Sequence, residues 1–246
     1  MICEDANSFV ADSLSGLYYC NIMTGTTIAQ RLTNVLESIP EEVTLVAVSK
    51  TKPNADILEA YKAGQRIFGE NRVQGLVVKA QELPNDIQWH FIGHLQSKKV
   101  KQIAGFVSMI HAVDSLKLLN TINKHAAQHG RVIQVLLQFH IAQEDSKFGL
   151  TAEKAIALLE DSSVADMNNI CIKGVMGMAT NTADTSIIRK EFSELRRIFN
   201  LLKADFFKGN STFDRISMGM SGDYTIAIEE GSNMVRIGST IFGPRQ

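Results

Sequence analysis

The fold follows from the stretch VTLVAVSK at residues 43–50 and from what comes after it. Residues 43–49 are almost continuously apolar and rich in β-branched side chains, which predicts a strand buried on both faces. Residues 54–63 then show the apolar spacing of a helix, and Gly64 is expected to close that helix. A buried strand followed directly by a helix is the repeating unit of parallel α/β folds.

The same alternation continues to the end of the chain. Seven further strands are predicted at residues 66–68, 87–92, 107–112, 132–140, 170–176, 214–218 and 234–237. Helices are predicted at residues 27–39, 73–82, 96–103, 115–129, 151–159, 185–203 and 222–230. Thr151 is expected to cap its helix, and Gly130 to close another. Eight strands in about 250 residues is the number that closes a (β/α)8 barrel, so we predict an α/β fold with a single TIM barrel. An open doubly wound sheet is the alternative.

We place the barrel at residues 25–246 and treat residues 1–24, which lack sustained periodicity, as a loosely ordered N-terminal extension. No apolar run approaches the roughly 20 residues that span a bilayer, so no membrane partner is expected. The first basic residue is Arg31, whereas Glu4, Asp5 and Asp12 precede it, which is the wrong charge for a secretory signal. We therefore expect a cytoplasmic protein.

The composition is that of a globular domain. The 246 residues include 25 Lys plus Arg and 26 Asp plus Glu, and 45% are hydrophobic. Nearly balanced charge gives no reason to expect a nucleic-acid partner. The three cysteines, Cys3, Cys20 and Cys171, are too few and too widely spaced for a disulfide framework or a zinc knuckle. Cys171 is expected to be a buried, reduced thiol in a strand.

In a barrel of this kind function lies at the carboxyl ends of the strands. Lys50 follows the first predicted strand, where desolvation would favour the neutral amine that attacks a carbonyl. The same position also suits a structural lysine whose stem packs along the strand end. Lys52 is a competing nucleophile, but Pro53 places it in an exposed turn.

Two glycine- and serine-rich turns follow the seventh and eighth strands, at residues 217–222 and 236–240. Glycines let the backbone approach an anion closely, and hydroxyl and N–H groups supply donors. The loops after these two strands form the recurrent phosphate site of the fold. A lysine nucleophile together with a phosphate cup indicates a phosphorylated aldehyde held as a Schiff base.

Several motifs, in order, resemble the YggS/PROSC family of pyridoxal phosphate homeostasis proteins. They are Ala47-Val48-Ser49-Lys50-Thr51-Lys52-Pro53, Phe68-Gly69-Glu70-Asn71, His90-Phe91-Ile92-Gly93-His94-Leu95-Gln96, Gly174-Val175-Met176, Ser217-Met218-Gly219-Met220-Ser221 and Val235-Arg236-Ile237-Gly238. The resemblance runs from about Ile28 to Gly243. It implies a barrel like the N-terminal domain of alanine racemase, with pyridoxal 5'-phosphate (PLP) bound at the mouth.

The resemblance also implies the cofactor-binding residues. They are Lys50, Asn71, Ser217, Ser221, Arg236, Gly238 and Ser239. Lys50 matches the family's PLP-bearing lysine, the serines and Gly238 match its phosphate cup, and Asn71 is expected to line the cofactor. Arg236 matches an arginine placed against the pyridine nitrogen, where a permanent cation disfavours ring protonation and weakens the cofactor as an electron sink.

This chain departs from the family pattern at two places. Lys98 stands where the family often has Asn, and Met178-Ala179-Thr180 replaces a turn that commonly contains Ile. The second change could alter what approaches the cofactor.

Other polar residues have structural interpretations. His90 and His94 lie four residues apart, which on a strand is roughly 13 Å, too far to share a metal. We expect packing or rim roles for them, rim positions for His111 and His140, and a structural role for Glu70. Ser221 has no evident His and Asp partners, which argues against a serine hydrolase. No metal site and no catalytic residue are predicted.

Three functions remain open at this point. The favoured one is a non-enzymatic PLP carrier or regulator whose partners, besides PLP, are apo PLP-dependent enzymes, and which we expect to be a monomer. The alternative is a small PLP-dependent enzyme resembling an amino-acid racemase. Alanine racemase draws an opposing tyrosine from a further domain, and we expect none because this sequence stops soon after its eighth predicted strand. A cofactor-free Schiff-base aldolase is the third.

Overall fold

The computed structural model describes residues 26–144 and 148–244, which form a closed barrel of eight parallel strands. Each strand pairs with the next in sequence, and the last pairs with the first. The strands are β1 (Thr44–Val48), β2 (Ile67–Glu70), β3 (Gln88–Phe91), β4 (Met109–Val113), β5 (Ile133–Gln138), β6 (Ile170–Met176), β7 (Arg215–Ser217) and β8 (Met234–Ile237). The predicted (β/α)8 TIM barrel is therefore confirmed.

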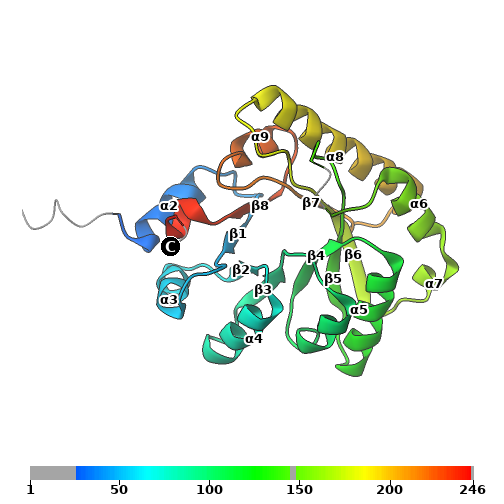
Figure 1. Cartoon of the computed structure of the whole chain (residues 1–246), viewed down its shortest axis with the longest axis horizontal. Coiled ribbons are helices and arrows are strands. Elements are labelled where there is room, and N and C mark those ends of the chain that lie inside the picture. Colours follow the sequence, from blue (N-terminus) through cyan, green and yellow to red (C-terminus); the bar gives the residue numbers. More distant parts are fainter. Residues whose placement is uncertain (1–25, 145–147, 245–246) are drawn as a thin grey trace, which may run out of the picture.

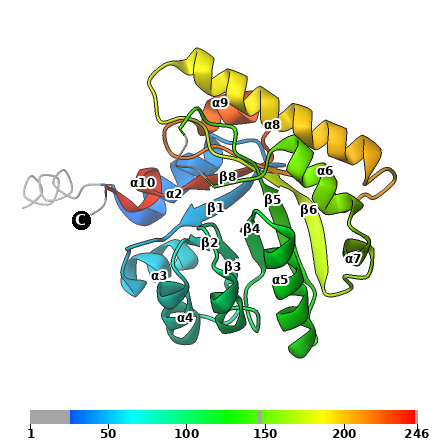
Figure 2. The same ribbon diagram turned by 45° about the vertical axis from the view of Figure 1, so that its right-hand side comes forward.

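Helices surround the strands in both views of the molecule (Figure 1, Figure 2). They are α2 (Ile28–Glu37), α3 (Asn54–Lys62), α4 (Val73–Glu82), the 3₁₀ helix η1 (Ser97–Gln102), α5 (Leu116–Gln128), α6 (Ala152–Glu160), α7 (Ser162–Ala165), α8 (Thr185–Asp205), α9 (Tyr224–Glu229) and α10 (Ser239–Phe242). The short helices α7 and α10 were not predicted from the sequence, because four residues are too few to show helical periodicity.

The predicted ends of several helices are confirmed. The hydroxyl of Thr151 accepts a hydrogen bond of 3.3 Å from the backbone N–H of Lys154, as an N-cap does. Gly64 follows α3 with φ +104° and Gly130 follows α5 with φ +61°. Such left-handed conformations cost glycine little, which explains why it closes these helices.

Strand β2 is longer at its carboxyl end than the sequence suggests. It was predicted to end at Phe68 but continues through Gly69 and Glu70, because Gly69 pairs with His90 of β3. A Cβ atom on Gly69 would meet the side chain of Val46 at 3.0 Å, so the glycine allows close packing with β1 rather than marking a turn.

The helix predicted at 96–103 is instead the 3₁₀ helix η1. The N–H of Lys99 donates to the carbonyl of Gln96 at 2.9 Å, which is the i to i+3 pattern. Short 3₁₀ segments of this kind commonly serve as connectors.

Side chains of the strands alternate between two hydrophobic layers. On β8, Val235 and Ile237 belong to the main core between strands and helices, whereas Met234 belongs to a separate cluster inside the barrel. Interior cluster members are Val46, Met109, Ala112, Leu136, Met176 and Met234. The barrel is therefore packed along its axis, as in other TIM barrels, and leaves room for a site only at an end.

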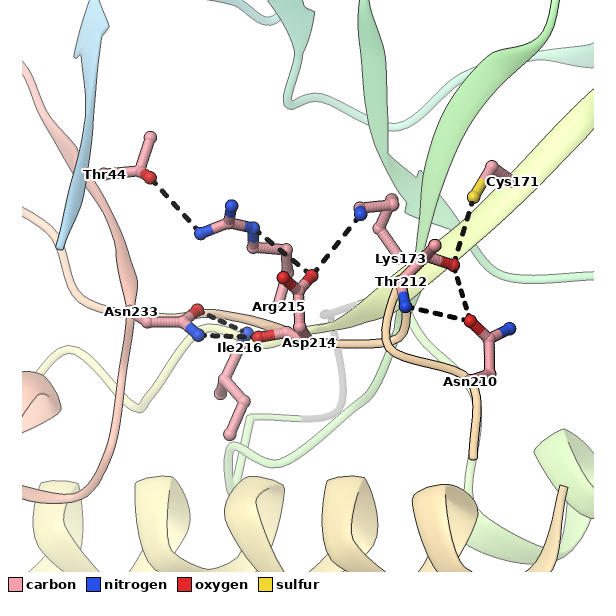
Figure 3. A network of polar contacts seen from close by, with 9 residues as sticks. All are labelled: Thr44, Cys171, Lys173, Asn210, Thr212, Asp214, Arg215, Ile216 and Asn233. Carbon is pink, nitrogen blue, oxygen red and sulfur yellow. Dashed lines mark hydrogen bonds and ion pairs between the residues drawn. The ribbon is translucent and has the colours of Figure 1, made fainter. Parts of the chain in front are cut away.

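A polar network closes the amino-terminal end of the barrel (Figure 3). The side chain of Asn233 accepts from the N–H of Ile216 at 2.9 Å and donates to the carbonyl of Asp214 at 2.6 Å. Arg215 donates to the hydroxyl of Thr44 at 3.5 Å and lies 3.4 Å from the Asp214 carboxylate. These contacts join β7, β8 and β1 at the end that usually serves stability rather than function.

Cys171 is half-exposed, so the expectation of a buried thiol is wrong. It is the second residue of β6, at the same amino-terminal rim, and its Sγ lies 3.7 Å from the hydroxyl of Thr212. Cys3, Cys20 and the extension predicted at residues 1–24 lie outside the described residues. Within the described ranges, no helix is long and apolar enough to cross a bilayer.

Candidate functional site

A cavity of about 410 Å³ opens at the carboxyl ends of the strands. This volume falls in the range of small-molecule sites. Six of the seven residues predicted to bind a cofactor line it: Lys50, Asn71, Ser221, Arg236, Gly238 and Ser239. The loops after β1, β2, β7 and β8 thus meet at one place, although these residues are spread over most of the sequence.

Ser217 is the predicted site residue that does not line this cavity. It is the last residue of β7, and it is fully buried inside the barrel. Its hydroxyl contacts Nη1 of Arg236 at 2.6 Å and Nδ1 of His111 at 3.1 Å. The side chain of Ser217 thus faces the barrel interior, whereas the other predicted cup residues line the cavity, and its membership of the phosphate cup stays a prediction.

The backbone around Lys50 is held in an unusual conformation. Ser49 is buried, and its N–H donates to Gly69 of β2 at 3.0 Å. Thr51 has φ +65°, and it is the one non-glycine residue with positive φ in residues 26–144 and 148–244. A threonine in this region is strained, and such strain persists only where the surroundings impose it. Lys50 therefore lies in a turn whose shape is fixed on both sides.

A buried ion pair supports this turn from behind. Glu70 accepts from the hydroxyl of Ser49 at 2.7 Å and pairs with Nζ of Lys79 at 2.6 Å. The same ammonium donates to the Ser49 carbonyl at 2.9 Å. These contacts with Ser49 and Lys79 agree with the structural role expected for Glu70.

Lys52, the competing lysine, also lines the cavity. Its ammonium donates to the carbonyl of Pro244 at 2.8 Å in an exposed contact. This hydrogen bond holds the Lys52 amine against the backbone of Pro244. The sequence preference for Lys50 as the nucleophile is consistent with that placement.

Two glycines allow close approaches around the cavity. A Cβ atom on Gly93 would lie 2.4 Å from the carbonyl oxygen of Asn71, so only glycine fits beside Asn71 without a shift of the backbone. A Cβ atom on Gly238 would lie 3.1 Å from the carbonyl oxygen of Val48. Both glycines line the cavity, and both let neighbouring strand ends converge on it.

The loops after β7 and β8 are joined by side-chain hydrogen bonds. The hydroxyl of Ser221 accepts from the N–H of Gly238 at 3.1 Å. Asp223 accepts from the N–H of Met220 at 2.5 Å and so fixes the turn that carries Ser221. The result is a hydroxyl-rich cup built from two adjacent strands.

Arg236 supplies a buried cation at the cavity. Only 3% of the residue is exposed, and Nη2 donates to the carbonyl of Gly177 at 2.9 Å. Burial lowers the pKa of Arg236 to about 10, while the nearby Asp223 carboxylate acts in the opposite direction. The guanidinium therefore carries its positive charge at neutral pH.

Two histidines lie below Arg236 inside the barrel. Nε2 of His111 lies 3.0 Å from Nδ1 of His90. Burial lowers the pKa of His90 to about 3, and the pKa of His111 falls well below its usual value because of burial and the nearby His90 and Arg236. Both imidazoles are therefore neutral. The rim position expected for His111 is wrong, because its side chain points into the barrel. The sequence feature that could have predicted this placement is a polar residue within an apolar strand.

His94 and Phe148 form part of the cavity mouth. Their rings stack with centroids 4.0 Å apart, and Nδ1 of His94 lies 3.3 Å from the carboxylate of Asp114. His94 thus occupies the rim while His90 is buried, so the two do not converge on one point. Over the ranges that the structure describes, no group of three His, Cys, Asp or Glu side chains is arranged to hold a metal. Phe148 was not identified from the sequence.

Comparison with known sequences gives a consistent result. The profile of the family described as "Alanine racemase, N-terminal domain" matches residues 25–246. The "Pyridoxal phosphate homeostasis protein" of Vibrio alginolyticus is 42% identical over 211 residues, covering 84% of this chain and 88% of that protein. The protein of the same name from Aquifex aeolicus is 35% identical over 228 residues, covering 88% and 98%.

Solved structures show the same architecture. PipY of Synechococcus elongatus, in a structure with PLP bound, is 34% identical with a TM-score of 0.80, covering 88% of this chain and all of PipY. Alanine racemase of Bartonella henselae is 15% identical with a TM-score of 0.67, covering 88% of this chain and 60% of the racemase. The second comparison shows a shared barrel fold alone.

Proposed function

The chain belongs to the alanine racemase N-terminal domain family and, within it, to the pyridoxal phosphate homeostasis proteins, and from this membership we propose that it binds PLP and takes part in PLP homeostasis. In this proposal Lys50 holds the cofactor as a Schiff base at the mouth of the barrel. The observation that carries it is the convergence of Lys50 and the Ser221–Gly238–Ser239 cup on one cavity.

The chemistry of the cavity fits the cofactor. A phosphate requires hydroxyl and backbone N–H donors and a close approach of the backbone. Ser221 and Ser239 offer hydroxyls, and the lack of a side chain at Gly238 leaves the backbone accessible beside them. Lys50 offers a primary amine in the same space, and Asn71 offers an amide.

PLP would supply an aldehyde, whose condensation with the neutral Lys50 amine forms a C=N bond and releases one water. The protein's own part is to hold the amine in place, which the fixed turn between Ser49 and Thr51 does. The cup would bind the phosphate and so set the distance of the aldehyde from Lys50.

Arg236 would lie beside the pyridine nitrogen of the cofactor and weaken the ring as an electron sink. A permanent cation beside a pyridine nitrogen disfavours protonation there, which weakens electron withdrawal by the ring. Arg236 is buried, cationic and part of the cavity wall. The racemase-like fold places an arginine at the same position, so our preference for a carrier or regulator without robust catalysis rests on the second base that a racemase needs.

A racemase-like enzyme is the alternative. It would need a second base opposite the lysine. The described tyrosines make contacts elsewhere: Tyr61 donates to Asp86 at 2.7 Å, and the Tyr224 hydroxyl lies 3.0 Å from that of Ser38. Assays of alanine racemase and transaminase activity on the PLP-loaded protein decide between the two functions, since the carrier proposal expects neither at a substantial rate.

The first experiment is to add PLP to the purified protein and record its visible spectrum before and after borohydride. We expect a Schiff-base band that borohydride abolishes, with the reduced adduct on the peptide that contains Lys50. Lys50→Ala should lose this adduct yet keep its free energy of unfolding within about 1 kcal/mol of the wild type. Lys52→Ala is the control and should keep the adduct. No band, or an adduct on Lys52 in the wild type, would overturn the assignment.

Delivery of PLP to apo PLP-dependent enzymes, a monomeric state and a cytoplasmic location are further parts of the proposal. Mixing the loaded protein with an apo-transaminase should restore transaminase activity. Size-exclusion chromatography with light scattering measures the mass, for which the monomer value is 27.1 kDa.

A further inference from the structure

A continuous chain of polar side chains crosses the barrel interior beneath the cavity. It runs from Arg236 of β8 through Ser217 of β7 and His111 of β4 to His90 of β3. The successive distances are 2.6, 3.1 and 3.0 Å. Each of these four residues is at most 4% exposed. An unbroken polar chain in an otherwise apolar barrel needs a reason, because burial of polar groups is costly unless every bond is made.

The chain has one direction of hydrogen bonding. A guanidinium can only donate, so Nη1 of Arg236 donates to Ser217 Oγ. In the arrangement that gives the Ser217 proton an acceptor, the hydroxyl donates to Nδ1 of His111, because the other group in contact with its Oγ, the Arg236 guanidinium, cannot accept. A neutral His111 with an acceptor at Nδ1 carries its proton at Nε2 and donates it to Nδ1 of His90. Every bond therefore points away from Arg236.

We propose that His111 is a positioning residue for Arg236, acting through Ser217, and that His90 fixes the tautomer of His111. This inference concerns the same cavity and rests on the proposed function for its effect on PLP. His111 does not line the cavity. Its role is to keep Ser217 oriented as an acceptor for the guanidinium.

The geometry explains why Arg236 needs this support. The guanidinium donates to Ser217, on β7, and to the carbonyl of Gly177, just after β6. With the Ser217 bond lost, the guanidinium can turn about the single bond to Gly177. If His111 instead carried a proton at Nδ1, Arg236 and His111 would both donate to Ser217 Oγ, and the proton of that hydroxyl would have no acceptor among these contacts. The neutral Nε2–H form of His111 is therefore the form that holds the cation at the cavity wall.

The first test needs no cofactor. In protein labelled with ¹⁵N-histidine, the ring-nitrogen shifts should show His111 protonated at Nε2 and unprotonated at Nδ1 at pH 7. In the same apoprotein, phenylglyoxal should modify Arg236, mapped by peptide mass, at least fivefold faster in His111→Phe than in the wild type. A proton on Nδ1, or an unchanged modification rate, would overturn the proposal.

The second test measures PLP. His111→Phe should still give the borohydride adduct on Lys50, while its Kd for PLP rises about tenfold and the absorption maximum of the bound cofactor shifts. His111→Asn keeps an acceptor near the Nδ1 position and should recover part of the loss. In Arg236→Ala, adding His111→Phe should change Kd less than twofold, because the two act as one unit. Full additivity would contradict the proposal.

Met109→Leu is the matched control, because Met109 lies two residues before His111 on β4 and packs in the interior cluster. It should leave the modification rate and the PLP spectrum unchanged; effects as large as those of His111→Phe would assign them to general repacking. Should His111→Phe fail to fold, Ser217→Ala breaks the same link with a smaller change. If the wild type bound no PLP, the proposed function would fail, while the ring shifts and the modification rate would still decide this inference.

Discussion

The Nζ atom of Lys79 lies 2.6 Å from Oε1 of Glu70, and the same atom donates to the carbonyl of Ser49, the residue before Lys50. The pair is almost entirely shielded from water, with side-chain exposures of 11% and 3%. A buried pair of this kind adds little net stability, but it is costly to break on one side only. The lysine and the glutamate therefore act as a brace for the strand end that carries Lys50.

Replacing Lys79 with methionine should destabilise the fold. The change leaves the Glu70 carboxylate buried without its cation, which costs about 3–5 kcal/mol. Urea denaturation measures this loss. The control is Lys62→Met at an exposed position near the end of α3, which should stay within about 0.5 kcal/mol of the wild type. Equal stability of the two variants would show that the pair is not a brace.

Arg236→Ala should weaken PLP binding without removing the Schiff base. Loss of a buried cation and its charge-assisted hydrogen bonds predicts an affinity about 10- to 100-fold lower. Fluorescence titration gives Kd, and borohydride mapping should still find Lys50. Arg215→Ala removes an arginine from the opposite end of the barrel and should leave the affinity unchanged. An unaltered Kd and spectrum in Arg236→Ala would exclude the contact.

Gly93→Ala should disturb the site through the backbone. The new methyl group would meet the Asn71 carbonyl at 2.4 Å, so the loop after β2 or β3 must move. We expect a stability loss of about 1–3 kcal/mol, measured by thermal and urea unfolding, together with weaker PLP binding. Gly75→Ala within α4 is the control, since its nearest neighbour would be 3.8 Å away, and helix propensity predicts a gain of about 0.5–1 kcal/mol. An equal loss of stability in both variants would show that the close approach of Gly93 to the Asn71 carbonyl is not the cause.

Stability should fall as the pH drops below about 6.5. His90 and His111 have lowered pKa values in the fold, that of His90 being about 3 against an ordinary 6.5. Between these values the unfolded state binds more protons than the native state, so acid favours unfolding. The contribution of His90 to stability is complete well above pH 6.5, and about 2 kcal/mol of it is lost by pH 5; the lowered pKa of His111 acts in the same direction.

Urea denaturation between pH 7.5 and 5 measures this slope. His90→Gln should reduce the slope, whereas His125→Gln, on the outer helix α5, should not. If stability depended on pH equally in the wild type, His90→Gln and His125→Gln, the buried imidazoles would not be the source of the pH dependence.

The barrel could be predicted because strands such as Thr44–Val48 and helices such as Ala152–Glu160 carry strong local patterns. The end of β2 could not, because Gly69 resembles a turn residue while it actually serves close packing. Lys50 and Gly238 were singled out because they follow strands directly, where the fold places function, whereas the role of Asn71 came from the family resemblance.

The interior chain could not be predicted from spacing. His111 meets residues that lie 21 and 106 positions away in the sequence, and only the closed barrel brings them together. Ser217 was assigned to the phosphate cup because of the glycines beside it. Whether a strand-end serine faces the cup or the interior depends on the register of β7 against β8, which no local pattern reveals.

The pairing of Val46 with Arg236 across β1 and β8 has a consequence for biosynthesis. As the chain leaves the ribosome, the strand that precedes Lys50 emerges first, and the strand that carries Arg236 emerges last. A nascent polypeptide therefore presents Lys50 with neither the residues after β7 nor Arg236 beside it. The cavity is completed only after β8 has emerged, so a ligand that needs both edges of the cavity cannot bind until the whole barrel has been synthesised.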